Sequence, residues 1–458
     1  MKENRSLAIS SKIQECKMGN IIGFLDKEFP SEVLKLKTEG AKTRERVFTV
    51  HNTLLTMVLT AVQQDKTLKN SVDLYYMIHQ EHKIQALAEL EQNLKAQKEA
   101  DASTSKRAGR PKTYALHMPK SLEKDISLNT AAFSKARERV PMDLVTELFK
   151  ASRVEGAKNC YSHWNGYRVF SADGTYLQLQ DTEGIRAQYE VKHNGVGSQG
   201  YPQGLLEVII ERGTGQLYNY KLSNRHVSEL SLFYEMLDEL PKGSLLLLDD
   251  LYNCFEIISK CKRLGIEIVV PAKRVRNYEV KERLAEGDEI IEIKTPKSRS
   301  KWLDNKEKPG KILLRRIQYR SLEGDDYVLI TTILNKAILK EDIQLLYLTR
   351  WDIEIGIREI KTVMDINVLR SKTPDMALKE LCVSLATYNL IRKIIYASIK
   401  DLPFSPKEDL IFKFYTLHQD ILMDKKGRIY NRWSSGRRRA ESIDSKTNPA
   451  GKKTQQNI

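Results

Sequence analysis

Two aspartates in this sequence stand where a structural role for an acid is uncommon. Asp173 lies between two β-rich runs, at 167–172 and 176–179, and is followed by Gly-Thr. Asp249 comes directly after the apolar run 244–248, which predicts a strand buried on both faces. Active sites of α/β sheets gather at such strand ends, and a lone buried carboxylate there needs a metal ion or a hydrogen-bond partner. The alternative role for Asp249 is a helix N-cap.

A third acid belongs to a polar face of the helix that the sequence predicts over 340–364. At about 100° per residue, one narrow face carries the side chains at offsets 0, 3, 7 and 14, namely Tyr347, Arg350, Glu354 and Lys361. Arg358 joins the same face. Three cations and a phenol around one acid suit a phosphate backbone held beside a metal ligand. The alternative is a solvated face of salt bridges.

The spacing Tyr-x2-Arg-x3-Glu-x6-Lys over 347–361 resembles the signature of the DDE transposases of the insertion-sequence 4 family, and every position matches. Asp173-Gly-Thr is similar to that family's first-Asp motif. The segment 248–256 is similar to its second-Asp motif, with Asp250 in place of the usual Arg. The resemblance extends over residues 130–400.

This resemblance implies roles for individual side chains. Asp173, Asp249 and Glu354 would be the catalytic metal ligands, and Asp249 is preferred to Asp250 because it directly ends the strand. Three carboxylates without thiol or imidazole partners suit magnesium, or manganese in its place, and two ions would serve an in-line displacement at phosphorus. The side chains expected to contact DNA phosphates are Tyr347, Arg350, Arg358 and Lys361. Trp302 would stack on a flipped base, and its alternative is an ordinary structural Trp.

The implied activity is cut-and-paste DNA transposition. Water attack would nick the transposon end, and the freed 3′-hydroxyl would then attack target DNA in the same site. The partners are double-stranded DNA, as transposon ends and as target, and a second copy of the chain in a homodimer. Two alternatives stay open: a domesticated or inactive sequence-specific DNA-binding protein, and a ribonuclease-H-like nuclease without strand transfer.

The predicted fold class is α/β, with a ribonuclease-H-like catalytic core interrupted by a β-rich insertion and preceded by a helical N-terminal DNA-binding region. Asp173 and Asp249 are 76 residues apart, and Asp249 and Glu354 are 105 apart, so a β-rich block fills the second gap. The expected organisation, in chain order, is a helical DNA-binding region (1–105), a basic linker (106–126), a helical lead-in (127–160), the first core part (161–272), the β-rich insertion (273–338), the second core part (339–400) and a C-terminal region with a basic, disordered tail (401–458).

The N-terminal region shows helical apolar spacing at 47–62, 68–77 and 84–98, followed by a change to small and charged residues at 99–112. Gly109-Arg110-Pro111 within that stretch resembles the core of an AT-hook, which would place an arginine in a narrow minor groove. The alternative is a plain basic linker. The strands expected in the insertion lie at 289–293, 312–319 and 327–334.

Composition sets the outer limits. The 458 residues include 75 Lys+Arg and 60 Asp+Glu, a formal net charge of +15, which favours a polyanionic partner. Ten of these bases, against three acids, lie within 424–458. No apolar run approaches the 18 residues of a membrane span, so no membrane association is expected. The five cysteines are scattered without a CxxC pair, which fits a reducing cytoplasm. The resemblance to insertion-sequence transposases implies a bacterial cytoplasmic protein associated with the nucleoid.

Overall fold

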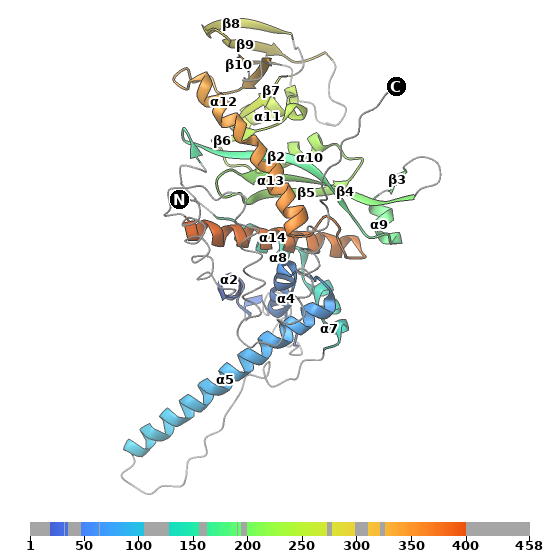
Figure 1. Cartoon of the computed structure of the whole chain (residues 1–458), viewed down its shortest axis with the longest axis vertical. Coiled ribbons are helices and arrows are strands. Elements are labelled where there is room, and N and C mark those ends of the chain that lie inside the picture. Colours follow the sequence, from blue (N-terminus) through green and yellow to red (C-terminus); the bar gives the residue numbers. More distant parts are fainter. Residues whose placement is uncertain are drawn as a thin grey trace, which may run out of the picture.

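The structure is a computed structural model, and it describes residues 19–31, 33–34, 47–63, 65–104, 128–154, 163–189, 191–193, 199–272, 277–297, 310–320 and 326–399. Within these ranges eleven strands form one mixed sheet, and helices cover both of its faces (Figure 1). The predicted α/β class is confirmed at this level. No helix in the described ranges is long and apolar enough to cross a membrane.

One half of the sheet is built around two parallel pairs. In order across the sheet it contains β5 (Leu217–Asn224), β4 (Gln199–Glu211), β2 (Tyr167–Gln178), β6 (Ser244–Leu247) and β7 (Glu267–Pro271). β2–β6 and β6–β7 are parallel, whereas β2–β4 and β4–β5 are antiparallel. Two short strands, β1 (His163–Trp164) and β3 (Val191–His193), pair with β2 and β4.

The other half continues the same sheet outward from β7. It consists of antiparallel strands in the order β11 (Asp326–Thr331), β10 (Lys311–Arg320), β9 (Asp288–Lys294) and β8 (Tyr278–Ala285). Three of these were expected from the sequence. β8 was missed because nearly all of its side chains are exposed, so it carries no alternating apolar pattern.

The two faces of β6 explain why its sequence is apolar throughout. Leu246 packs on one face with α10 (Glu229–Met236) and α11 (Phe255–Leu264). Leu245 and Leu247 pack on the other face with α12 (Lys340–Leu348). A strand covered on both sides needs apolar residues at every position, as predicted.

The N-terminal helices join the sheet through a long helix, α14 (Pro374–Ile399), which packs against α8 (Met142–Ser152) and α4 (Val50–Val62). Their apolar side chains share one core with Leu177 of β2 and Val208 of β4. The other described helices in this part are α2 (Gly19–Glu28), α5 (Leu68–Thr104) and α7 (Thr130–Arg139).

Two expectations about the N-terminal region are corrected. Residues 68–77 and 84–98 were expected as separate helices, but they belong to the single helix α5, which projects from the rest of the molecule (Figure 1). No glycine or proline interrupts residues 78–83, so nothing ends the first helix. The expected change to a linker at 99 is also wrong, because α5 continues to Thr104. The linker at 106–126, with its AT-hook-like core, and the basic tail lie outside the described residues.

Two further corrections concern the segments that carry the acids. β2 runs unbroken through Asp173, which was expected between two strands, because Asp173, Gly174 and Thr175 stay paired in register with β4. The single helix expected over 340–364 is instead divided into α12, the 3-10 turn η3 (Thr349–Trp351), α13 (Asp352–Arg358) and the π-helical turn η4 (Glu359–Val363). At the first of these junctions, between α12 and η3, the Thr349 hydroxyl donates to the Leu346 carbonyl at 2.7 Å and stabilises the tighter 3-10 turn.

A buried arginine braces the start of α12 against the insertion strands. The Arg315 side chain of β10 is 2% exposed and donates to both carboxylate oxygens of Asp288, at 2.8 and 2.6 Å. Its remaining terminal nitrogen donates to the carbonyls of Ile338 and Asn335, at 2.8 and 3.2 Å. These carbonyls lie just before α12, so the brace fixes where that helix begins.

Arg315→Ala is expected to destabilise the fold by about 3–5 kcal/mol, because it leaves the Asp288 carboxylate buried without its partner. The neighbouring Arg316→Ala is the matched control. Its ion pair with Glu289 spans 3.7 Å, so we expect a loss of about 1 kcal/mol or less. Urea unfolding of both variants measures the difference, and equal losses would contradict the bracing role.

Candidate active site

The parallel register of β2 and β6 brings the two aspartates together. Ser171 pairs with Leu247, and moving two residues forward on each strand reaches Asp173 and Asp249. Both side chains are half-buried, and the charge of Asp249 raises the pKa of Asp173. The sequence prediction placed both acids near strand ends, and the register now puts them at the same place on the sheet.

The segment that carries Glu354 is attached to both of these strands. The Tyr347 hydroxyl donates to the carbonyl of Leu248, the residue before Asp249, at 3.1 Å. The Lys361 ammonium group donates to the Thr175 hydroxyl at 3.1 Å and to the Tyr176 carbonyl at 3.3 Å, just after Asp173. Two members of the predicted polar face therefore bind protein groups, and they hold the segment that carries Glu354 against the segments that carry the two aspartates.

Glu354 is the most open of the three acids. Its side chain is 46% exposed, and Oε1 accepts from the Arg350 guanidinium at 3.3 Å, an i,i+4 pair on the same segment. Arg350 itself is 12% exposed and stacks over the Trp351 ring at 4.8 Å. The Arg350 Nε atom is buried and has no hydrogen-bond partner among the described residues. The Arg350 guanidinium therefore has one buried N–H donor that no described residue binds.

Burial and neighbouring acids raise the pKa values of Asp173 and Glu229. Burial, together with the charges of Glu229, Asp249 and Glu354, raises the pKa of Asp173 from 3.8 to about 6, against one hydrogen bond from the Gly174 amide. Burial likewise raises the pKa of Glu229, assisted by the charge of Asp249. The centre therefore carries negative charge that the described cations only partly compensate.

Two glutamates and a tyrosine lie beside Gly174, the residue after Asp173, and the sequence analysis did not identify them. The Tyr252 hydroxyl lies 2.9 Å from a carboxylate oxygen of Glu207 and 2.7 Å from one of Glu229. Gly174 makes room for both acids: a Cβ at this position would lie 2.6 Å from the Glu229 carboxyl carbon and 2.9 Å from Glu207. A lone acid inside the apolar run 205–210 is the sequence signal that could have identified Glu207.

The Tyr252 hydroxyl has only one proton to donate. Since it contacts two carboxyl groups at hydrogen-bond distance, one of those groups must itself carry a proton. Glu207 is fully buried, and burial, with the charge of Glu229, raises its pKa well above the usual range. Burial therefore favours the neutral form of Glu207. Its Oε2 atom has no hydrogen-bond partner among the described residues.

The chemistry of this site fits a hard divalent cation. The charges of Asp249 and Glu354 both act on Asp173, and a cation would neutralise the part of its raised pKa that these charges cause. As the side chains lie, no three histidine, cysteine, aspartate or glutamate side chains within the described ranges form a ready-made metal site. Glu354 is instead paired with Arg350, and Asp249 accepts from the Leu251 amide at 2.7 Å.

The remaining predicted residues have different outcomes. Asp249 does cap the 3-10 turn η2 (Asp250–Tyr252), so the N-cap alternative holds alongside its place in the acid centre. Arg358 is exposed at the end of α13, and its predicted phosphate contact stays a prediction. Trp302 lies outside the described residues.

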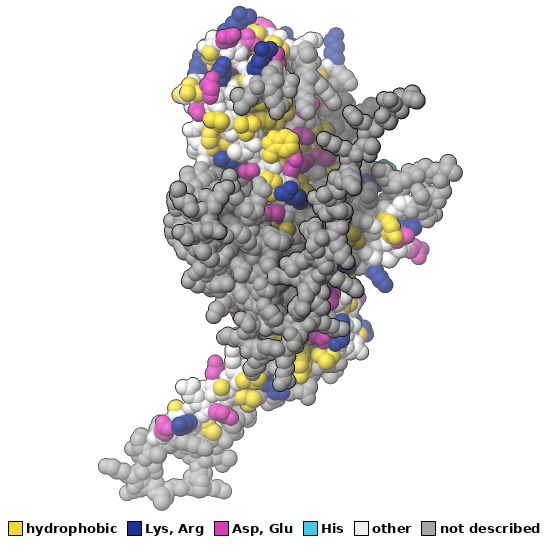
Figure 2. All heavy atoms as spheres, viewed as in Figure 1, with side chains coloured by type: hydrophobic (Ala, Val, Ile, Leu, Met, Phe, Trp, Pro, Cys, Tyr) yellow, Lys and Arg dark blue, Asp and Glu magenta, His cyan; other side chains and the backbone are white. Residues whose placement is uncertain are grey.

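An apolar surface adjoins the site on α12 and η3. Figure 2 shows hydrophobic side chains gathered over this part of the molecule, and the large exposed ones are Leu345, Leu348 and Trp351, which are 58–65% exposed. Trp351 carries the Arg350 guanidinium on its ring, next to Glu354. The rim of the acid centre is thus amphipathic.

Comparison with known proteins identifies the class. Residues 164–390 match the model of the transposase DDE domain family, and the range contains all three predicted acids and the Tyr-Arg-Glu-Lys segment. This part of the chain belongs to the DDE transposase family, which confirms the resemblance drawn from the sequence.

Particular relatives agree with that class. The chain is 26% identical over 269 residues to the transposase InsG for insertion sequence element IS4 of Escherichia coli (strain K12), covering 57% of this chain and 60% of that protein. It is 26% identical over 141 residues to the putative transposase InsZ of the same organism, covering 30% of this chain and 47% of that protein. The matched parts thus span less than two thirds of either relative.

One solved structure is also similar, the piggyBac transposase synaptic complex with hairpin DNA studied by cryo-electron microscopy. It has a TM-score of 0.37 and 11% identity, and the match covers 94% of this chain and 84% of that one. Similarity at this level carries no argument about fold or function.

Asp173→Asn is expected to stabilise the metal-free protein at pH 8 by about 1–2 kcal/mol, discounted for partial solvent exposure, and to have little effect at pH 4. The folded-state pKa lies above the unfolded one, so wild-type stability falls as pH rises from about 4 through 6. Unfolding in EDTA across this range measures the effect, with Asp250→Asn as control. A stability gain that does not change with pH would contradict it.

Proposed function

We propose that this protein is the DNA transposase of an insertion sequence, which binds terminal inverted repeats and catalyses metal-dependent strand cleavage and strand transfer. One observation carries the proposal. The segment with the Tyr-Arg-Glu-Lys spacing is hydrogen-bonded through Tyr347 and Lys361 to the very strands that carry Asp249 and Asp173. A solvated helix face would not make these two long-range contacts.

We also propose that the core is ribonuclease-H-like. The strand order β5-β4-β2-β6-β7, with two antiparallel pairings followed by two parallel ones, supports this assignment. Strands β8–β11 stand between the second Asp and Glu354, where an insertion is expected in this family. The domain boundaries predicted from the sequence remain part of this proposal.

Asp173, Asp249 and Glu354 would hold magnesium, or manganese in its place, and the bound metal would activate the attacking oxygen and stabilise the leaving one. The protein's own groups do the positioning. The Arg350 guanidinium, with one donor still unused, is placed to bind a phosphate beside Glu354. Lys361 and Tyr347 keep the acid-bearing segments at a fixed separation, and a phosphate near Lys361 would share that ammonium group with Thr175.

The partners follow from the same proposal. The DNA would be held by the N-terminal helical region and by basic segments of the chain, and two copies of the chain would assemble on it. We place this activity in the bacterial cytoplasm, at the nucleoid.

Asp173→Asn, Asp249→Asn and Glu354→Gln are each expected to lower magnesium-dependent cleavage of transposon-end DNA at least 1,000-fold, because each removes one of three charges needed to hold the metal (about 4 kcal/mol). DNA affinity, measured by gel shift, should stay near wild type. Asp250→Asn is the matched control and should cleave normally, which separates the two adjacent aspartates.

A strand-transfer assay on the same proteins scores joined products against simple nicks. Nicks without joined products would favour a nuclease of the same fold, and binding without either product would favour a domesticated DNA-binding protein. Cleavage by Asp173→Asn at the wild-type rate would overturn the assignment of the site.

A further inference from the structure

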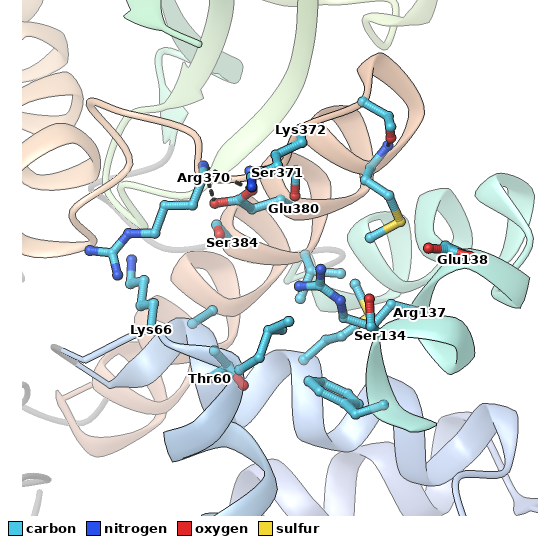
Figure 3. Close-up of a pocket in the computed structure, with 17 residues that line it drawn as sticks. Thr60, Lys66, Ser134, Arg137, Glu138, Arg370, Ser371, Lys372, Glu380 and Ser384 are labelled. Atoms are coloured by element: carbon cyan, nitrogen blue, oxygen red, sulfur yellow. Dashed lines mark hydrogen bonds between the residues drawn. The ribbon is translucent and has the colours of Figure 1, made fainter. Parts of the chain in front are cut away.

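A second site lies on the opposite side of α14 from the sheet, between the N-terminal helices and the core. It is a half-open cavity of about 450 Å³, lined by α4, the start of α5, α7, the segment 370–373 and α14 (Figure 3). Its cationic lining residues come from separate parts of the chain: Lys66, Arg137, Arg370 and Lys372. Two acids, Glu138 and Glu380, also line it. The cavity therefore has an excess of positive charge.

Three of these six charged groups are already held by the protein. The Glu380 carboxylate accepts from the backbone amides of Arg370 and Ser371, at 2.9 and 2.8 Å. The Arg370 guanidinium donates to Asp365 at 2.8 Å, and Lys66 donates to the carbonyls of Met364 and Asp365. These hydrogen bonds hold the cavity-lining segments in place, and the Glu380 carboxylate is bound by backbone amides.

Arg137 has a buried donor that no described residue binds. Its side chain extends from α7 toward Glu380 and Ser384 of α14 (Figure 3). It lies over the Phe133 ring at 5.6 Å, and its buried Nε has no hydrogen-bond partner among the described residues. A guanidinium carries five donors in a fixed plane, and leaving a buried donor unsatisfied costs free energy. An anion in the cavity would satisfy it.

The lining selects the kind of anion. Ser134, Thr373 and Ser384 also line the cavity and bring hydroxyl groups to it, and Phe133 and Met376 supply an apolar wall. Arginine and hydroxyl donors in one cavity suit the three or four acceptor oxygens of a phosphate, for which arginine provides bidentate geometry. The apolar wall would contact the sugar of the same nucleotide.

We propose that this cavity binds a backbone phosphate of DNA, with Arg137 as its main ligand, and so clamps DNA at the junction of the N-terminal helices and the catalytic core. The inference rests on the proposed function and adds a contact outside the acid centre. A phosphate held here would touch α7 and α14 at once, so DNA binding and the packing of the two parts would support each other.

The test uses the full chain and a fluorescently labelled DNA duplex of mixed sequence, titrated at several salt concentrations. Arg137→Gln should weaken binding about tenfold and reduce the slope of log affinity against log salt by about 1, as expected for one lost phosphate contact. Arg139→Gln is the control. It removes the same charge from the same last turn of α7, at an exposed position outside the cavity, and should have a smaller effect on both quantities.

A second variant guards against a folding defect. Ser134→Asp places a negative charge in the cavity without removing Arg137, and it should weaken DNA binding similarly while unfolding at the wild-type temperature. DNA affinity unchanged in both variants would overturn the proposal. If inorganic phosphate, against chloride at equal ionic strength, raises the unfolding temperature of wild type but not of Arg137→Gln while DNA affinity is unchanged, the cavity binds free phosphate and the DNA assignment is wrong.

The two proposals fail separately. If Asp173→Asn loses cleavage but Arg137→Gln binds DNA as tightly as wild type, the transposase proposal is supported and the proposed phosphate contact in the cavity is wrong. Tight, Arg137-dependent binding of the duplex by a wild-type protein that never cleaves transposon ends retains the clamp and removes the catalytic assignment.

Discussion

The parallel pairing of β2 with β6 is the constraint on which the rest of the candidate site depends. Its register sets Asp173 beside Asp249, although 75 residues of chain separate them. A shift of one residue would turn one carboxylate to the opposite face of the sheet. The apolar residues of β6 prevent such a shift, because Leu245 and Leu247 must face α12 while Leu246 faces α10 and α11. The packing of the core thus determines the geometry of the acids.

Glu354 reaches this place by a different route. Arg315 fixes the start of α12, Tyr347 attaches its end to Leu248, and Lys361 attaches the following turns to β2. A continuous helix would rotate these side chains by a constant angle. The 3-10 and π-helical turns change that rotation, and the contacts at both ends nevertheless hold the segment with Glu354 against the strands of the aspartates. Such departures from α-helical geometry are frequent at functional sites.

Placing several carboxyl groups close together is electrostatically unfavourable, and different neighbouring groups offset this repulsion at different acids. Burial favours the neutral form of Glu207 beside Gly174, Tyr252 bridges it to Glu229, and Arg350 offsets part of the charge of Glu354. Burial and the neighbouring acids also raise the pKa of Asp173. A cation or a phosphate-bound metal would therefore meet carboxylates that the fold already holds in place. The stability of that fold comes from its apolar core and not from the acid centre.

The sequence by itself determined the α/β class, the three acids, the Tyr-Arg-Glu-Lys spacing and the buried strand before Asp249. These follow from local patterns: apolar runs, strand ends and helical periodicity. Only the tertiary structure decided that β2 is continuous through Asp173, that residues 340–364 form several turns, that Glu207, Glu229 and Tyr252 lie beneath the site, and that Arg137 faces a cavity. Each of these depends on contacts between residues far apart in the chain, and on burial, which no local pattern records.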